Sequence, residues 1–111
     1  MFHKAKNDNY SEALPGILRK TLVYGEQTLL AEFRLQAGRI LPLHAHLYEQ
    51  TGYLVAGRLR FTIGAERFEA GPGDSWCVPA NVPHAAEVLE DAVAIEVFSP
   101  LREDYLPPAA T

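Results

Sequence analysis

The chain is poor in cysteine, with Cys77 as the only one among 111 residues. A single cysteine excludes an intramolecular disulfide, and we expect Cys77 to lie in the apolar core as a small buried side chain. The sequence also lacks an apolar run near the roughly 20 residues that cross a bilayer. Residues 1–16 contain no apolar segment of the signal-peptide kind. These absences predict a soluble, cytoplasmic protein that has no membrane partner.

Positive charge is scarce and scattered along the chain. Ten Lys and Arg stand against 14 Asp and Glu, which leaves a formal net charge of −4. Because no basic residues cluster, the composition argues against nucleic acid as a partner. It leaves room for a local basic pocket that takes an acidic small molecule. The length suits one domain over residues 1–111, with an N-terminal arm at 1–15 and a C-terminal turn and loose tail at 100–111.

Helix signals are few, because eight glycines and eight prolines interrupt the chain. The clearest pattern is the alternation of apolar and polar residues over 58–63, where Leu59, Phe61 and Ile63 share one face. Glycines at 57 and 64 flank this strand, and the GAE that follows predicts a hairpin turn. Short helical turns are expected only in SPLREDYL near the C-terminus and in NYSEALPG near the N-terminus.

Four other segments have the composition of strands. They are Thr28–Gly38, SWCVP, HAAEVLE and AVAIEVF, with the last two separated by the pair ED. Many short strands between turn signals are typical of a sandwich or barrel. We therefore predict one all-β domain.

The strongest candidate for chemistry is the histidine pair in LHAHLYEQ. On a strand, His44 and His46 would point to the same face, so both imidazoles could reach one cation. A hairpin could bring Gln50 back opposite them, with Glu49 as the alternative ligand. A third imidazole, His84, begins a later strand. Three imidazoles suit a divalent transition metal, whereas a structural or solvent-facing histidine pair is the alternative.

Two charged residues stand out in the last third of the chain. Glu96 lies in the apolar segment DAVAIEVFSP, on the same face as Ala94 and Phe98. It either lines a cavity, where burial would perturb its pKa, or points to solvent from an edge strand. Arg102 follows Pro100 and could fold over the mouth of a barrel.

The two histidine-bearing segments together resemble the cupin family. Gly38, His44, His46, Gln50 and Gly57 are in register with its first motif. Residues Gly73, Pro79 and His84 match the second, although Asn81 and Val88 replace a glycine and an asparagine. The resemblance implies a jelly-roll β-barrel of two antiparallel sheets. It also implies one divalent metal ion (Ni, Zn, Mn or Fe) on His44, His46, Gln50 and His84.

A narrower resemblance, to the pectin-degradation cupins of the KdgF type, covers nearly the whole chain. It implies an isomerase that opens and ketonises 4,5-unsaturated uronate monosaccharides. In this family pattern Arg102 matches a functional arginine, and Glu96 replaces a functional aspartate. Substrate contacts are expected from a further group: Arg60, Tyr53, Trp76 and Phe98. Arg58 and Arg60 otherwise look like the solvated face of their strand.

Two other functions stay open at this point. One is a non-catalytic cupin that binds a metal or a sugar, and the other is an Fe-dependent cupin dioxygenase. We also expect a homodimer, for which the segment before Gly38, with Leu29, Leu30 and Phe33, offers apolar side chains.

Overall fold

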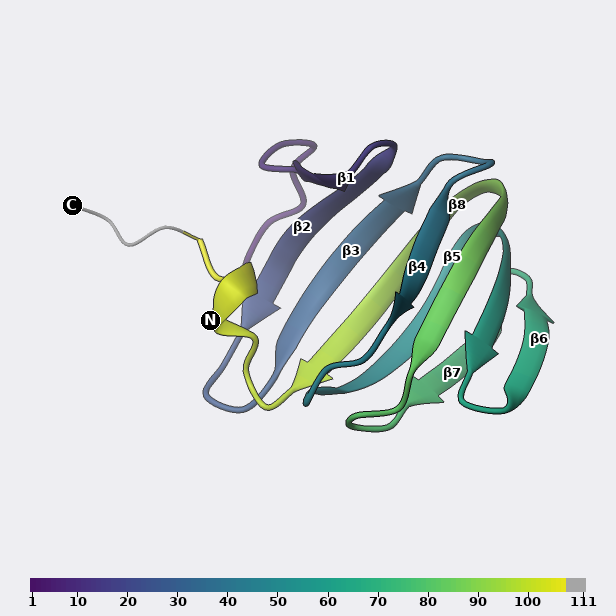
Figure 1. Ribbon diagram of the computed structural model, residues 1–111. Helices are drawn as coiled ribbons and strands as arrows, with labels where there is room; N and C mark the ends of the chain where they lie inside the picture. Colours follow the sequence, from purple (N-terminus) through teal and green to yellow (C-terminus); the bar gives the residue numbers. More distant parts are fainter. Residues whose placement is uncertain (108–111) are drawn as a thin grey trace.

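The computed structural model describes residues 1–107, which fold into eight strands and one short 3₁₀ helix, η1. Figure 1 shows the strands in chain order. Their bounds are β1 Ser11–Leu14, β2 Ile17–Tyr24, β3 Leu29–Leu35, β4 Ile40–His44, β5 Glu49–Ile63, β6 Glu66–Ala70, β7 Ser75–Val78 and β8 His84–Ser99, followed by η1 Glu103–Tyr105.

Two long strands, β5 and β8, organise the barrel. They pair with each other along most of their length, and every strand pair is antiparallel. In one layer, the second half of β8 pairs with β3 and the first half of β5 pairs with β7. In the other layer, the first half of β8 pairs with β4 and the second half of β5 pairs with β6. Two antiparallel layers result (Figure 1), which confirms the predicted all-β jelly-roll fold.

The bend that separates these layers lies at Gly57, inside β5 rather than at its end. Gly57 has φ +90°, and a Cβ there would lie 2.3 Å from the carbonyl oxygen of Asp91 on β8. Only glycine fits this close approach. The pair Glu90–Asp91, which the sequence indicated as a break between two strands, is the corresponding bend in the continuous strand β8. Both predicted boundaries were therefore wrong, because a bent strand contains the same residues as a turn.

The buried face of β5 changes its phase at this bend. Gln50, Gly52 and Leu54 are buried before it, and Leu59, Phe61 and Ile63 are buried after it. Bulges between Leu54 and Leu59 account for the change. The predicted alternation over 58–63 and the hairpin into β6 are confirmed.

The apolar core lies between the two layers. Leu29 and Phe33, which the sequence offered for dimer contacts, are buried in it and are 0% and 8% exposed. The prediction of a buried Cys77 is wrong, because this side chain lies on the exposed face of β7 between buried Trp76 and Val78. Strand alternation explains the correction, since neighbours of buried residues point outward.

Both ends of the described chain hold short elements. NYSEALPG forms strand β1 and its turn into β2 rather than a helical turn. SPLREDYL contains η1, as predicted. The loose tail predicted at the C-terminus partly lies outside the described residues. Among residues 1–107, no helix is long and apolar enough to cross a membrane.

Candidate metal centre

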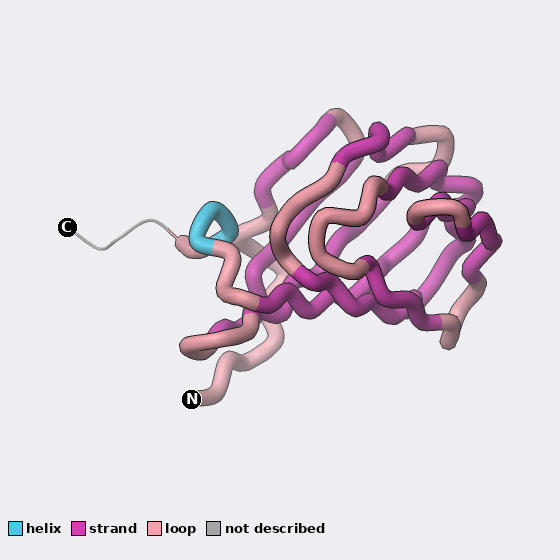
Figure 2. Tube along the Cα trace, turned by 60° about the horizontal axis from the view of Figure 1, so that its bottom comes forward, coloured by secondary structure: helices cyan, strands magenta, loops and turns pink. Residues whose placement is uncertain are grey.

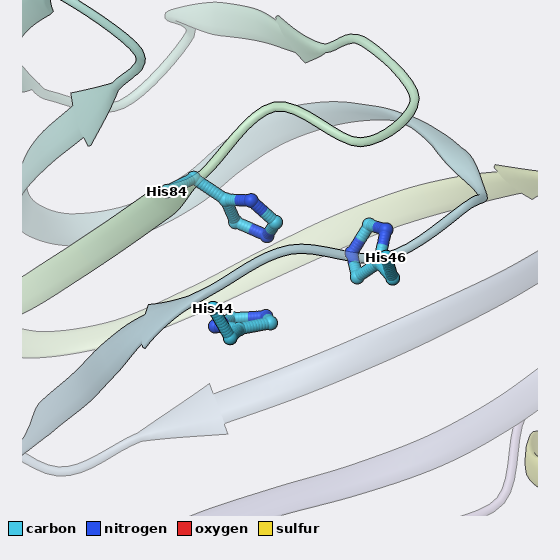
Figure 3. A group of neighbouring side chains, drawn as sticks. All are labelled: His44, His46 and His84. Atoms are coloured by element: carbon cyan, nitrogen blue, oxygen red, sulfur yellow. The ribbon is translucent and has the colours of Figure 1, made fainter.

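Three histidines converge at the end of the barrel where β4 ends and β8 begins. Figure 2 brings this end forward and shows the loops around it. Potential ligand atoms of His44, His46 and His84 all lie within 4.8 Å of one another, and the three rings face a common space in Figure 3. His44 and His84 pair across β4 and β8. The sequence predicted that one strand carries both His44 and His46. Instead β4 ends at His44, and His46 reaches the same space from the following loop.

Backbone carbonyls hold each of these rings in one tautomer. The Nδ1 atoms of His44, His46 and His84 lie 2.8, 3.0 and 2.9 Å from the carbonyl oxygens of Pro42, Tyr48 and Val82. A carbonyl can only accept a hydrogen bond, so Nδ1 carries the hydrogen in each ring. The three Nε2 atoms therefore keep their lone pairs, which is the form that binds a metal ion.

Two of these Nε2 lone pairs have no hydrogen-bond donor opposite them, which suits a cation site. The Nε2 atom of His84 is buried and has no hydrogen-bond partner among the described residues. The Nε2 atom of His46 lies 3.1 Å from the side-chain oxygen of Gln50, so two acceptor atoms face each other. A shared cation would satisfy both atoms. Gln50 thus lies opposite the histidines as expected, whereas Glu49 is exposed on the neighbouring position of β5.

Burial favours the neutral form of two of the imidazoles. It lowers the pKa of His46, and the Arg102 guanidinium lowers that pKa further. Burial also lowers the pKa of His84. A neutral imidazole binds a metal ion without first losing a proton, so both environments favour coordination.

Glu96 lies on β8 in the wall of the same cavity and is only 6% exposed. The alternative of a solvent-facing edge position is therefore wrong. One carboxylate oxygen accepts a hydrogen bond of 2.8 Å from the indole nitrogen of Trp76, and the other accepts one from the side-chain nitrogen of Gln50. Burial raises the pKa of Glu96, against the opposing effect of these two donors.

Arg102 closes one side of the cavity, as the proline turn suggested. Its guanidinium carbon lies 3.8 Å from the ring centroid of Tyr105 and about equally far, 4.9 and 5.0 Å, from those of Tyr48 and Phe98. Asp104 accepts hydrogen bonds from Nε at 3.2 Å and Nη2 at 2.7 Å. Among residues 1–107, Nη1 makes no side-chain hydrogen bond. The guanidinium is held in place with one nitrogen available.

Only two of the four residues expected to contact the substrate line the cavity. Trp76 and Phe98 line it together with Arg102 and Tyr105. Arg60 and Tyr53 instead project from the outer surface, where Arg60 pairs with Glu69 and Glu87 and Tyr53 is 50% exposed. The expectation that Arg60 and Tyr53 contact a substrate in this cavity is therefore wrong.

Two residues of the site were missed from the sequence. Asp104 and Tyr105 fix the Arg102 guanidinium from positions two and three residues further along the chain. The signal was the run REDY itself, because a 3₁₀ turn brings such neighbours together.

A cupin-domain profile matches residues 31–99, more than half of the chain. The chain belongs to the cupin family. This cupin is similar to the pectin degradation protein KdgF of Dickeya dadantii (strain 3937), with 29% identity over 99 residues that cover 87% of this chain and 90% of that protein. It is also 31% identical over 77 residues to the oxalate decarboxylase OxdC of Bacillus subtilis (strain 168). That match covers 65% of this cupin and only 20% of the decarboxylase.

Solved structures agree with this assignment. KdgF from Halomonas sp. superposes on this cupin with a TM-score of 0.85 at 30% identity, covering 89% of this chain and 94% of the other. An RmlC-like cupin from Shewanella frigidimarina NCIMB 400 superposes with a TM-score of 0.88 at 26% identity, covering 95% of both chains. The predicted family is confirmed.

Proposed function

We propose that this cupin is a metal-dependent isomerase of 4,5-unsaturated uronate monosaccharides, which it converts to the linear keto form. The observation that carries the proposal is one cavity in which three imidazoles with free Nε2 lone pairs lie beside a fixed arginine. The similarity to two KdgF proteins, one named for pectin degradation, supports the substrate class.

His44, His46, Gln50 and His84 would hold one divalent transition metal ion. Three imidazole nitrogens and a carboxamide oxygen suit Ni, Zn, Mn or Fe, and the unpartnered Nε2 of His84 fits that assignment. When bound, the ion supplies Lewis-acid polarisation of an oxygen atom of the sugar acid. The similarity to an oxalate decarboxylase supports a metal at this site but does not select among the four.

Arg102 would bind the carboxylate of the substrate. Guanidinium groups recognise carboxylates through charge-assisted hydrogen bonds, and here the group is held by Asp104 and Tyr105 before a substrate arrives. The rings of Trp76 and Phe98 provide apolar wall for the sugar. Preorganisation of this kind reduces the entropy lost on binding.

The reaction rearranges bonds without any oxidant or reductant. The bond between the anomeric carbon and the ring oxygen breaks, and the anomeric hydroxyl loses its proton as the aldehyde forms. The ring oxygen takes up a proton and becomes an enol hydroxyl, and the enol becomes a ketone when that hydroxyl loses its proton and C4 gains one. Glu96, in the wall of the cavity, is our candidate for moving this proton. Burial raises its pKa, while both of its oxygens accept hydrogen bonds that oppose this shift.

The test is turnover of unsaturated galacturonate by metal-loaded protein, followed as loss of the ultraviolet absorbance of the double bond. Arg102→Gln removes the carboxylate contact, so we expect kcat/KM to fall on the order of 10²-fold. Arg19→Gln is the matched control, because Arg19 also stacks at 3.8 Å on Tyr105 but does not line the cavity. Equal activity of the two variants would contradict the role of Arg102.

The same assay separates the alternatives. Metal binding without turnover of any unsaturated uronate would favour a non-catalytic binding cupin. Iron in the purified protein together with oxygen uptake would favour the dioxygenase. The homodimer and the cytoplasmic location stay predictions, and sedimentation of the purified protein tests the first.

A further inference from the structure

Three neighbouring strands place Trp76, Gly52 and Glu96 in one row on the inner face of the barrel. Gly52 on β5 pairs with Trp76 on β7 at one side and with Glu96 on β8 at the other. The row lies beside the metal centre, since Gln50 is two positions before Gly52 on the same face of β5. The strand register therefore brings an indole donor, a carboxylate and a carboxamide together.

Gly52 is what lets the indole cross its strand. A Cβ at this position would lie 2.3 Å from the indole nitrogen of Trp76, and the backbone there is not in the left-handed region. The missing side chain, not a special backbone conformation, is therefore what the site requires. Lying flat over Gly52, the indole reaches Glu96 with a 2.8 Å hydrogen bond. This contact anchors one oxygen of the carboxylate.

The other oxygen of Glu96 determines which way the Gln50 amide points. It accepts a hydrogen bond from the side-chain nitrogen of Gln50. Because the nitrogen and oxygen of a carboxamide lie on opposite edges, the oxygen of Gln50 then faces away from Glu96, 3.1 Å from the Nε2 atom of His46. A carboxylate only accepts hydrogen bonds when ionised, so the reversed amide would place two oxygens against each other.

We propose that Glu96, anchored by Trp76, is a positioning residue that holds the Gln50 side chain with its oxygen, rather than its nitrogen, toward the three histidines. The inference rests on the metal centre of the proposed function and assigns Glu96 an action through Gln50. The oxygen carries the lone pairs that a cation needs, whereas the NH₂ group has none to offer.

Glu96→Gln tests this role with little change in shape. The new amide can accept from Trp76 only with its oxygen, so its NH₂ group faces Gln50. The Gln50 amide must then turn its oxygen toward position 96 and its NH₂ group toward the histidines. We expect the dissociation constants of Mn²⁺ and Ni²⁺, measured by titration calorimetry, to rise about 10- to 100-fold. Glu49→Gln is the matched control, because it removes the same charge from the adjacent, outward position.

A second measurement reports the orientation itself. Trp76 is the only tryptophan, so its indole N–H gives one identifiable NMR signal, and the Gln50 side-chain NH₂ can be assigned beside it. In Glu96→Gln the Gln50 signals should move more than the indole signal does. Glu96→Asp keeps an acceptor but loses reach, so its metal affinity should fall between those of the parent and Glu96→Gln.

The outcomes separate this inference from the proposed function. Metal affinity within twofold of the parent in Glu96→Gln, or equal losses in Glu96→Gln and Glu49→Gln, would overturn the positioning role. A weakened site in Glu96→Gln alone would support it even if no unsaturated uronate is turned over, in which case only the proposed function fails. A parent protein that binds neither metal would overturn both.

Discussion

Two glutamates of this barrel accept hydrogen bonds in the same pattern but in opposite surroundings. Glu69, on the outer surface of β6, accepts from Arg60 at 3.0 Å and Arg58 at 3.1 Å. Glu96, on the inner face of β8, accepts from Trp76 at 2.8 Å and from Gln50. The donors outside are cations in water, and the donors inside are neutral groups in a largely apolar wall.

The two surroundings shift the pKa values of these carboxyl groups in opposite directions. Hydrogen bonds from Arg60 and Arg58 lower the pKa of Glu69, whereas burial raises the pKa of Glu96. Solvent screens the outer group, so its geometry can vary at little cost. The inner group is only 6% exposed, so the loss of a partner leaves a buried oxygen without its hydrogen bond at a higher cost. The inner group is therefore the one suited to orient a ligand.

The largest difference should follow from adding a methyl group beside each glutamate. Gly52→Ala would drive a Cβ into the Trp76 ring, and we expect a loss of about 3 kcal/mol in the free energy of unfolding. Gly71→Ala, near Arg58, meets its closest atom only at 3.8 Å and should leave stability unchanged. Urea denaturation of both variants measures the contrast. A tolerated Gly52→Ala would show that the indole is free to move.

A smaller difference should follow from removing one donor. Trp76→Phe leaves one oxygen of Glu96 without its indole partner and leaves a small void, so we expect a loss of about 2 kcal/mol. Arg58→Gln, its counterpart outside, should shift the urea midpoint by no more than the scatter of repeated measurements. Similar shifts in the two variants would contradict the distinction between the inner and outer groups.

The smallest effect concerns the charge of Glu69. A lowered pKa means that the ion pairs stabilise the fold above the unfolded-state value, and that this contribution is lost as the pH falls through the lower folded-state value. Glu69→Gln should therefore be slightly less stable than the parent at pH 7, and this difference should shrink as the pH falls through the folded-state pKa of Glu69. In 1 M NaCl at pH 7 the difference should also vanish. A difference that stays constant as the pH is lowered would point to packing rather than charge.

Local patterning was sufficient for several of these features. Alternation along DAVAIEVF placed Ala94, Glu96 and Phe98 on one face, and all three are buried. The same rule gave no side for Tyr53, because the run YLVA is apolar on both faces and carries no preference for either. The rule placed Arg60 on the solvated face, where it pairs with Glu69 and Glu87, so the expected substrate contact of Arg60 was wrong although its side of the strand was predicted.

By itself, the sequence determined the all-β class, the cupin motifs and the three imidazoles, because residue spacing along a strand decides which side chains share a face. Only the tertiary structure decided what those side chains meet. The bend at Gly57, the space over Gly52 and the pairing of β5 with both β7 and β8 depend on residues far apart in the chain. The hydrogen bonds of Glu96 span 20 and 46 positions, and no local pattern encodes contacts over that separation.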